Sequence, residues 1–159
     1  MKKQVKDLLF HVNAASGKEN PTLLRVILGD QTTRLDFGYI ATSYYVKGGW
    51  ITIAPDTFLQ IKGDIQRYQL KEVIGISQAP VKLKFKSTKD YQFFSLHFEP
   101  LPQKNLVFDM IEKLNGTPND FNYYGIEIKL KTNAVRTIGV KQNGLGLFIR
   151  TRVHIFFSL

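Results

Sequence analysis

Apolar and polar side chains alternate along most of this chain in short runs. The clearest runs lie at residues 81–86, 94–98 and 126–131, where every second side chain is apolar. Successive side chains of a β-strand point to opposite faces of the sheet, so a period of two predicts strands with one buried face. Gly, Pro, Asn and Asp separate the runs and supply turns. The pattern is typical of an all-β protein, and we expect a single-domain antiparallel β-sandwich over residues 1–159.

Two further runs follow the same rule near the N-terminus. Their expected buried faces are Leu24, Val26 and Leu28 in one run and Thr33, Leu35 and Phe37 in the next. Arg34 and Asp36 then fall on the opposite face of the second strand. Gly48-Gly49 and Gly63-Asp64 predict hairpin turns, because glycine adopts the positive φ that tight turns require. We expect Trp50, which follows the first turn, to be a core residue, with a carbohydrate platform as the alternative.

The segment HFEPLPQKNLVFDMIE, residues 97–112, contains a sharp corner. Pro100 and Pro102 lack the backbone N–H that a strand donates, so the preceding strand has to end there. After the prolines, apolar side chains recur every four residues from Leu106 to Leu114, which gives one apolar helical face. The spacing predicts one short helix near residues 105–114, and we interpret the prolines as a chain reversal.

The same segment carries the best candidate for metal binding or proton transfer. His97 and Glu99 lie on the same side of one predicted strand, with Asp109 and Glu112 nearby in sequence. A structural zinc site normally has four ligands, so two are insufficient. We interpret His97 and Glu99 as solvent-facing residues and the two acids as ordinary surface residues. The chain has no cysteine, and no nucleophile or phosphate-loop motif is complete, so we expect no catalytic, cofactor or metal site.

Positive charge is concentrated at the C-terminal end. Residues 131–159 contain five basic residues and no acidic residue, hence +5 of the net charge of +9. We expect a basic hairpin over residues 132–159, turning at Asn143-Gly144. One face of its last strand would carry Phe148, Arg150, Arg152 and His154. Such a face can bind nucleic acid or an anionic surface, and the alternative is a solvated outer face.

A second basic stripe lies in the main body of the chain. Lys82, Lys84 and Lys86 alternate with apolar residues, and Tyr91 and Phe93 follow shortly after. Lysines in this arrangement can follow a phosphate backbone while the rings stack on bases. The alternative is that the lysines prevent an edge strand from pairing with another molecule.

Three segments together resemble a family of β-rich domains of the Bacteroides group. They are GWITIAPDTFLQIKGDIQRYQLKEVIGI, FFSLHFEPLPQKNLVFDMIE and YYGIEIK, within a family-like core of about residues 22–131. Those domains often precede a thioredoxin-like domain in exported proteins. The resemblance implies a non-catalytic accessory domain, periplasmic or secreted, and transfers no functional residue. This chain differs in having no paired-cysteine redox domain, and residues 1–16 lack the apolar run of a signal peptide.

The sequence therefore favours a non-enzymatic interaction or accessory domain whose partner is another protein. A nucleic-acid or anionic-surface binding protein that uses the basic C-terminal strand is the alternative. A metal-dependent enzyme with its site at His97, beside the proline corner, is a third hypothesis. No run approaches the ~20 apolar residues of a membrane span.

Overall fold

The computed structural model describes residues 8–11, 20–130, 138–142 and 145–149. The chain divides into two compact units, Met1–Lys129 and Leu130–Leu159. Strands, turns and loops account for all the described residues, and no helix occurs among them. The all-β antiparallel prediction is confirmed.

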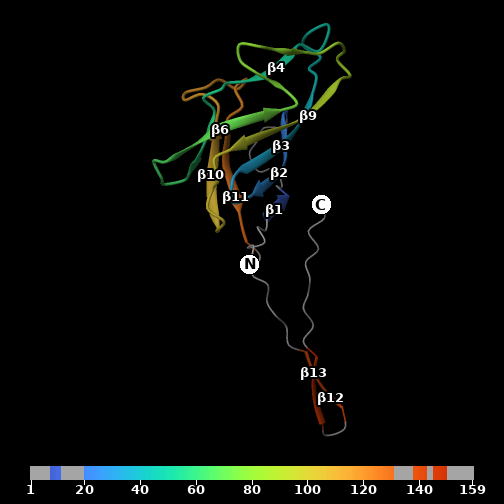
Figure 1. Ribbon diagram of the computed structural model, residues 1–159. Coiled ribbons are helices and arrows are strands. Elements are labelled where there is room, and N and C mark those ends of the chain that lie inside the picture. The colour runs from blue at the N-terminus through green and yellow to red at the C-terminus, as the bar shows by residue number, and fades with distance from the viewer. Residues whose placement is uncertain (1–7, 12–19, 131–137, 143–144, 150–159) are drawn as a thin grey trace. The chain divides into compact units, whose positions relative to one another are not determined.

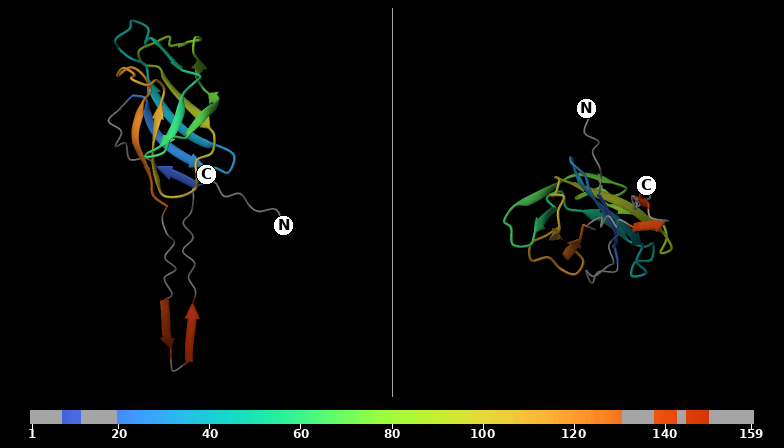
Figure 2. Two further views of the ribbon diagram at one scale, coloured as in Figure 1. Left: turned by 90° about the vertical axis from the view of Figure 1, so that its left-hand side faces the viewer. Right: turned by 90° about the horizontal axis from the view of Figure 1, so that it is seen from below.

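The first unit is built on one large antiparallel sheet that curls into a half-barrel (Figures 1 and 2). Its strands, in spatial order, are β1 (Leu8–His11), β2 (Thr22–Leu28), β3 (Thr33–Ile40), β9 (Tyr91–Phe98), β6 (Arg67–Ile74), β5 (Phe58–Ile61), β10 (Leu106–Ile111) and β11 (Tyr123–Ile128). A small sheet places β4 (Trp50–Ile53) between β7 (Ser77–Gln78) and β8 (Leu83–Lys84). In this small sheet β4 is parallel to β7 and antiparallel to β8.

The large sheet curls because its two halves bury their apolar faces against each other. The Phe37 ring of β3 stacks on Phe94 of β9 with ring centres 5.0 Å apart, and it also contacts Tyr123 of β11 at 5.3 Å. Tyr123 is fully buried, and its hydroxyl donates to the carbonyl oxygen of Pro21 at 2.5 Å. Burying one such aromatic side chain contributes about 1.5–3 kcal/mol. These rings therefore hold β3 and β11 together across the core.

Several sequence predictions are confirmed strand by strand. Phe94, Leu96 and Phe98 are buried on one face of β9, and Ile126 and Ile128 are buried on β11. The predicted turn at residues 63–64 joins β5 to β6, with residue 60 opposite residue 67.

The helix predicted near residues 105–114 is wrong. Leu106–Ile111 forms β10, which pairs with β5 on one side and β11 on the other. Leu106, Phe108 and Met110 are all buried, and Leu114 is 62% exposed. A spacing of four residues satisfies a strand as well as a helix, because it is twice the strand period. The two neighbouring strands decide between them, since only a strand supplies hydrogen bonds to both.

Three other predictions are wrong. Leu24 is 41% exposed and Leu23 is buried instead, because an irregularity in the β2–β3 register between Leu23 and Arg25 shifts the alternation. Trp50 is 39% exposed and is not a core residue. The hairpin predicted across Gly48-Gly49 does not form either, since β4 pairs with β7 and β8.

The proline corner is a chain reversal, as predicted. Leu101 is buried, and its backbone N–H donates to Thr33 Oγ1 at 2.8 Å. The Gln103 side chain donates to the carbonyl oxygen of Leu28 at 2.9 Å. These bonds attach the corner to the ends of β2 and β3.

Glu112 is buried, so its interpretation as a surface acid is wrong. One carboxylate oxygen accepts the backbone N–H of Ala54 at 2.9 Å, and the other accepts that of Phe121 at 2.6 Å. A carboxylate has no hydrogen to donate, so both oxygens are free to accept. Glu112 therefore connects the chain after β10 to Phe121, nine residues on, and to Ala54, 58 residues away in sequence.

The second unit contains a hairpin of β12 (Ile138–Gln142) and β13 (Leu145–Ile149). Gln142 lies opposite Leu145, where the sequence predicts a turn. Residues 150–159 lie outside the described part of the chain.

Replacing Glu112 by glutamine tests this connection. Glu112→Gln keeps the shape but turns one acceptor into an amino group that faces a backbone N–H. We expect the free energy of unfolding to fall by about 1–3 kcal/mol in urea denaturation. The control Glu127→Gln removes an exposed acid that pairs with Lys129 at 3.0 Å, and we expect it to change stability by less than about 1 kcal/mol. Equal effects of the two substitutions would contradict the assignment.

Candidate functional site

The lysine stripe predicted from the sequence lies on the surface. Lys82, Lys84 and Lys86 are all exposed, and Lys84 belongs to β8 at an edge of the small sheet. The ammonium nitrogen of Lys82 lies 4.0 Å from the ring centre of Trp50, a cation–π contact. The edge position fits the interpretation that the lysines prevent the strand from pairing with another molecule. The exposed Trp50 ring beside Lys82 fits the alternative that the stripe binds nucleic acid.

The basic face predicted for the C-terminal strand is mostly outside the described residues. Arg150, Arg152 and His154 all fall in residues 150–159. Phe148 lies in β13, opposite Gly139, in the second unit.

His97 and Glu99 do not converge on a common site. His97 Nδ1 lies 3.8 Å from a carboxylate oxygen of Glu72. The Glu99 carboxylate accepts from Lys71 at 2.8 Å and from the backbone of Gln69 at 3.0 Å, and the Lys71 bond lowers the pKa of Glu99. Within the part of the chain that the structure describes, no three His, Asp or Glu side chains are grouped so as to hold a metal ion.

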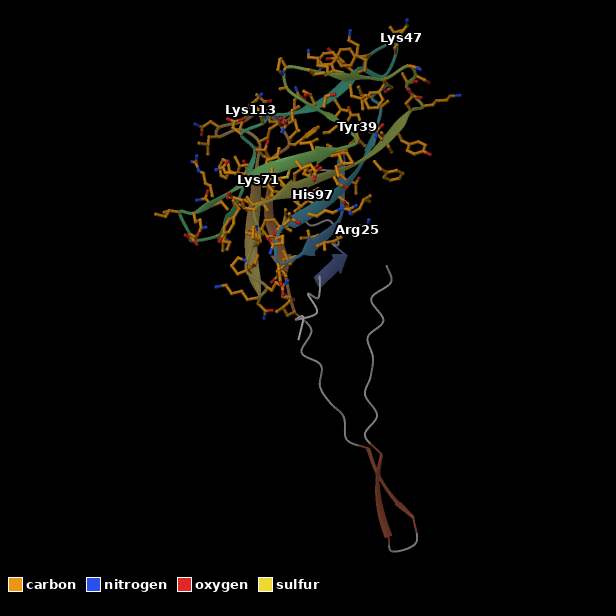
Figure 3. The ribbon with its side chains drawn as sticks, in the orientation of Figure 1. Arg25, Tyr39, Lys47, Lys71, His97 and Lys113 are labelled. Atoms are coloured by element: carbon orange, nitrogen blue, oxygen red, sulfur yellow. The ribbon has the colours of Figure 1, made fainter. Side chains whose placement is uncertain are left out.

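A different set of residues meets on the solvent-facing side of the large sheet. Leu35 and Phe37 of β3 point into the core, so Arg34 and Asp36 lie on the other face. The strand register places Asp36 opposite Arg25 of β2 on one side. On the other side it places Asp36 opposite Ser95 of β9. In Figure 3, Arg25 and His97 lie over this part of the sheet, whereas Lys47 lies at the end of the unit that carries β4.

Asp36 is the centre of this group. Its carboxylate accepts hydrogen bonds from Arg25 Nε, from Arg34 Nε at 2.6 Å and from the Ser95 hydroxyl at 2.6 Å. Burial by itself raises the pKa of Asp36, because a charged carboxylate is poorly solvated there. The bonds from Ser95, Arg25 and Arg34 outweigh burial and hold the pKa below its ordinary value. Asp36 therefore stays ionised and fixes both guanidinium groups.

A groove of about 510 Å³ runs along this group. Arg25 and Arg34 lie in it with side chains 40% and 37% exposed. Its apolar walls include Leu24, Ile74 and Phe93, of which Ile74 is 50% and Phe93 63% exposed. The full lining is Leu24, Arg25, Arg34, Asp36, Phe37, Ile74, Gly75, Phe93, Phe94 and Ser95.

Gly38 lets the wall form close to the sheet. A β-carbon on Gly38 would meet the Phe93 ring at 3.4 Å and Leu24 Cδ1 at 3.6 Å, so both side chains lie over the bare backbone. We call the groove with Leu24, Ile74, Phe93, Arg25 and Arg34 the outer groove.

The outer groove has the composition of a binding site. Ligand sites combine apolar walls with a few polar groups that fix orientation. A serine nucleophile needs a base that accepts its proton, and a carboxylate with a lowered pKa is a weak base. Ser95 donates to such a carboxylate. Asp36 is therefore poorly suited to take the proton of Ser95.

Comparisons with protein-family models, curated proteins and solved structures gave no match for this chain. The described residues include no helix long and apolar enough to cross a membrane.

Sequence reasoning missed the outer groove. Its only local signal is the alternation that puts Arg34 and Asp36 on the face opposite Leu35. The other members of the group come from β2 and β9, and Ser95 is 59 residues from Asp36 in sequence. Pairing of that kind depends on the strand register.

Asp36→Asn tests the role of the carboxylate. An amide leaves the two arginines without their counter-charge, and we expect a loss of about 2 kcal/mol in the free energy of unfolding at pH 7. Because the folded-state pKa of Asp36 is lowered, its stabilisation is complete above the unfolded-state pKa and is lost as the pH falls through the folded-state value. The difference in the free energy of unfolding between the wild type and Asp36→Asn should therefore become smaller below about pH 4.

Urea denaturation of the wild type and Asp36→Asn, from pH 7 to below about pH 4, measures this difference in the free energy of unfolding. Asp64→Asn is the control, because Asp64 is exposed. A difference that is constant with pH would contradict the assignment.

Proposed function

We propose that this protein is a non-enzymatic interaction domain that binds another protein through the outer groove. The proposal depends on one observation, the group of exposed apolar side chains on the solvent face of β2, β3, β9 and β6. Phe93 lies beside Tyr91, with ring centres 5.5 Å apart, and Tyr91 pairs in register with the exposed Ile40. Large contiguous apolar patches on a protein surface mark interaction sites.

The chemistry of the patch suits a protein partner. Aromatic and arginine side chains are the residues that most often dominate the binding energy of interfaces. Here Phe93 and Tyr91 lie on the same sheet face as Arg25 and Arg34. The family resemblance, which implies an accessory domain, supports the same proposal.

A peptide selection tests the proposal without a known partner. Random dodecapeptides displayed on phage are selected on the wild-type protein, and the enriched peptides are then measured on Phe93→Asp. A charge in the apolar wall costs several kcal/mol when a ligand buries it, so we expect affinity to fall at least tenfold.

The matched control is Tyr124→Asp, which adds the same charge at another exposed aromatic residue, on β11. We expect it to keep the wild-type affinity. Enriched peptides that bind Phe93→Asp as tightly as the wild type would contradict the proposal.

Binding of an anionic polymer is a second candidate function, and the lysine stripe favours it. Lys84, Lys86, Lys89 and Tyr91 are among the residues that line a hollow of about 340 Å³. The carboxylate of Asp90, which also lines the hollow, accepts the backbone N–H groups of residues 86 and 87. Lysines beside exposed rings suit single-stranded nucleic acid.

A salt titration tests the second candidate. We expect a labelled single-stranded oligonucleotide to bind the wild type at low salt, with a log–log slope that falls by about one to two in the variant Lys84→Gln/Lys86→Gln. Lys62→Gln/Lys104→Gln removes the same charge at exposed positions outside the hollow and should leave the slope unchanged. The same loss in both variants, or no binding at low salt, would contradict this candidate.

A further inference from the structure

Resting on the proposed function, we propose that the outer groove selects an extended acidic segment of the partner protein. A carboxylate of that segment binds Arg25 and Arg34, and an apolar side chain two residues away packs on Phe93. Asp36 acts as a positioning residue for the two arginines.

The first step of the argument is the geometry of the guanidinium groups. A guanidinium carries five N–H donors, one on Nε and four on the terminal nitrogens. Asp36 takes the Nε hydrogens of both Arg25 and Arg34. The terminal nitrogens of the two side chains have no hydrogen-bond partner among the described residues. Both guanidinium groups are therefore held in place by Asp36, and the N–H groups of their terminal nitrogens can donate to a ligand.

The second step is charge. Two guanidinium groups and one carboxylate leave a net charge of +1 in the outer groove. The whole chain carries +9, so long-range attraction also favours an acidic partner. A second copy of this chain would bring the same positive charge and is disfavoured as an occupant. Carboxylate–arginine pairs form charge-assisted, often bidentate bonds, so an acidic side chain fits these donors well.

The third step is the apolar wall. Leu24, Ile74 and Phe93 line the outer groove together with the arginines. An extended peptide places every second side chain on the same face. An acidic residue followed two positions later by an aromatic or aliphatic residue therefore presents both groups to the outer groove at once.

The test uses three blocked octapeptides, SETFTLTS and its variants with Gln or Lys in place of Glu. Backbone amide NMR titration measures weak binding and shows which residues respond. We expect the Glu peptide to shift the signals of β2, β3 and β9 around the outer groove. It should bind at least tenfold more tightly than the Gln peptide, and the Lys peptide should bind weakest.

Variants then assign the preference to the arginines. Arg25→Gln and Arg34→Gln should each reduce the affinity of the Glu peptide about tenfold and leave that of the Gln peptide unchanged. Arg67→Gln is the matched control, because Arg67 is an exposed arginine of β6 that stacks on Phe58. It should not alter the preference, and thermal melts check that each variant is folded.

Several results would overturn the inference. If the Glu and Gln peptides bind equally and both are lost in Phe93→Asp, the acidic preference is wrong although the groove is a protein-binding site. If no peptide shifts the signals of the outer groove, the inference fails, and the phage selection decides the proposed function separately. If a single-stranded oligonucleotide shifts the same signals and binds more tightly than the Glu peptide, the occupant is a nucleic acid and the inference is wrong.

Discussion

The carboxylate of Asp36, held between Arg25 and Arg34, depends on the same strand register that forms the core. On β3, Leu35 and Phe37 pack inward while Asp36 lies between them in sequence and faces outward. A shift of one residue between β3 and its neighbours would move the core side chains to solvent and separate Asp36 from Arg25 of β2 and Ser95 of β9. The core and the outer groove are therefore fixed together, and the core supplies the free energy that holds two like charges close to each other.

The sequence predicts much of the fold because the strand period is a local property. It fails where another strand decides the outcome. Leu106 and Met110 fit a helix and a strand equally well, and only the neighbours β5 and β11 select the strand. The irregularity between Leu23 and Arg25 likewise changes which side chain is buried, although nothing in the local pattern marks it.

The candidate site is less predictable than the fold, because it is assembled across strands. Arg34 and Asp36 can be assigned to one face from their own strand, but Arg25 and Ser95 join them only through the register of β2 and β9. The lysine stripe is the opposite case, since its residues are adjacent in sequence and its exposure follows from its own alternation. Surfaces made by one strand can be predicted from sequence, whereas the outer groove needs the sheet.

The central claim is that Asp36 is ionised and paired with both arginines in the folded protein. Carboxyl-detected NMR titration of Asp36 measures this directly. The account predicts that the pKa of Asp36 in the wild type lies below that of an unpaired aspartate. It also predicts that this pKa rises in Arg25→Gln/Arg34→Gln, because the arginines no longer oppose the effect of burial. An ordinary or raised pKa in the wild type, or one that does not respond to removal of the arginines, would contradict it.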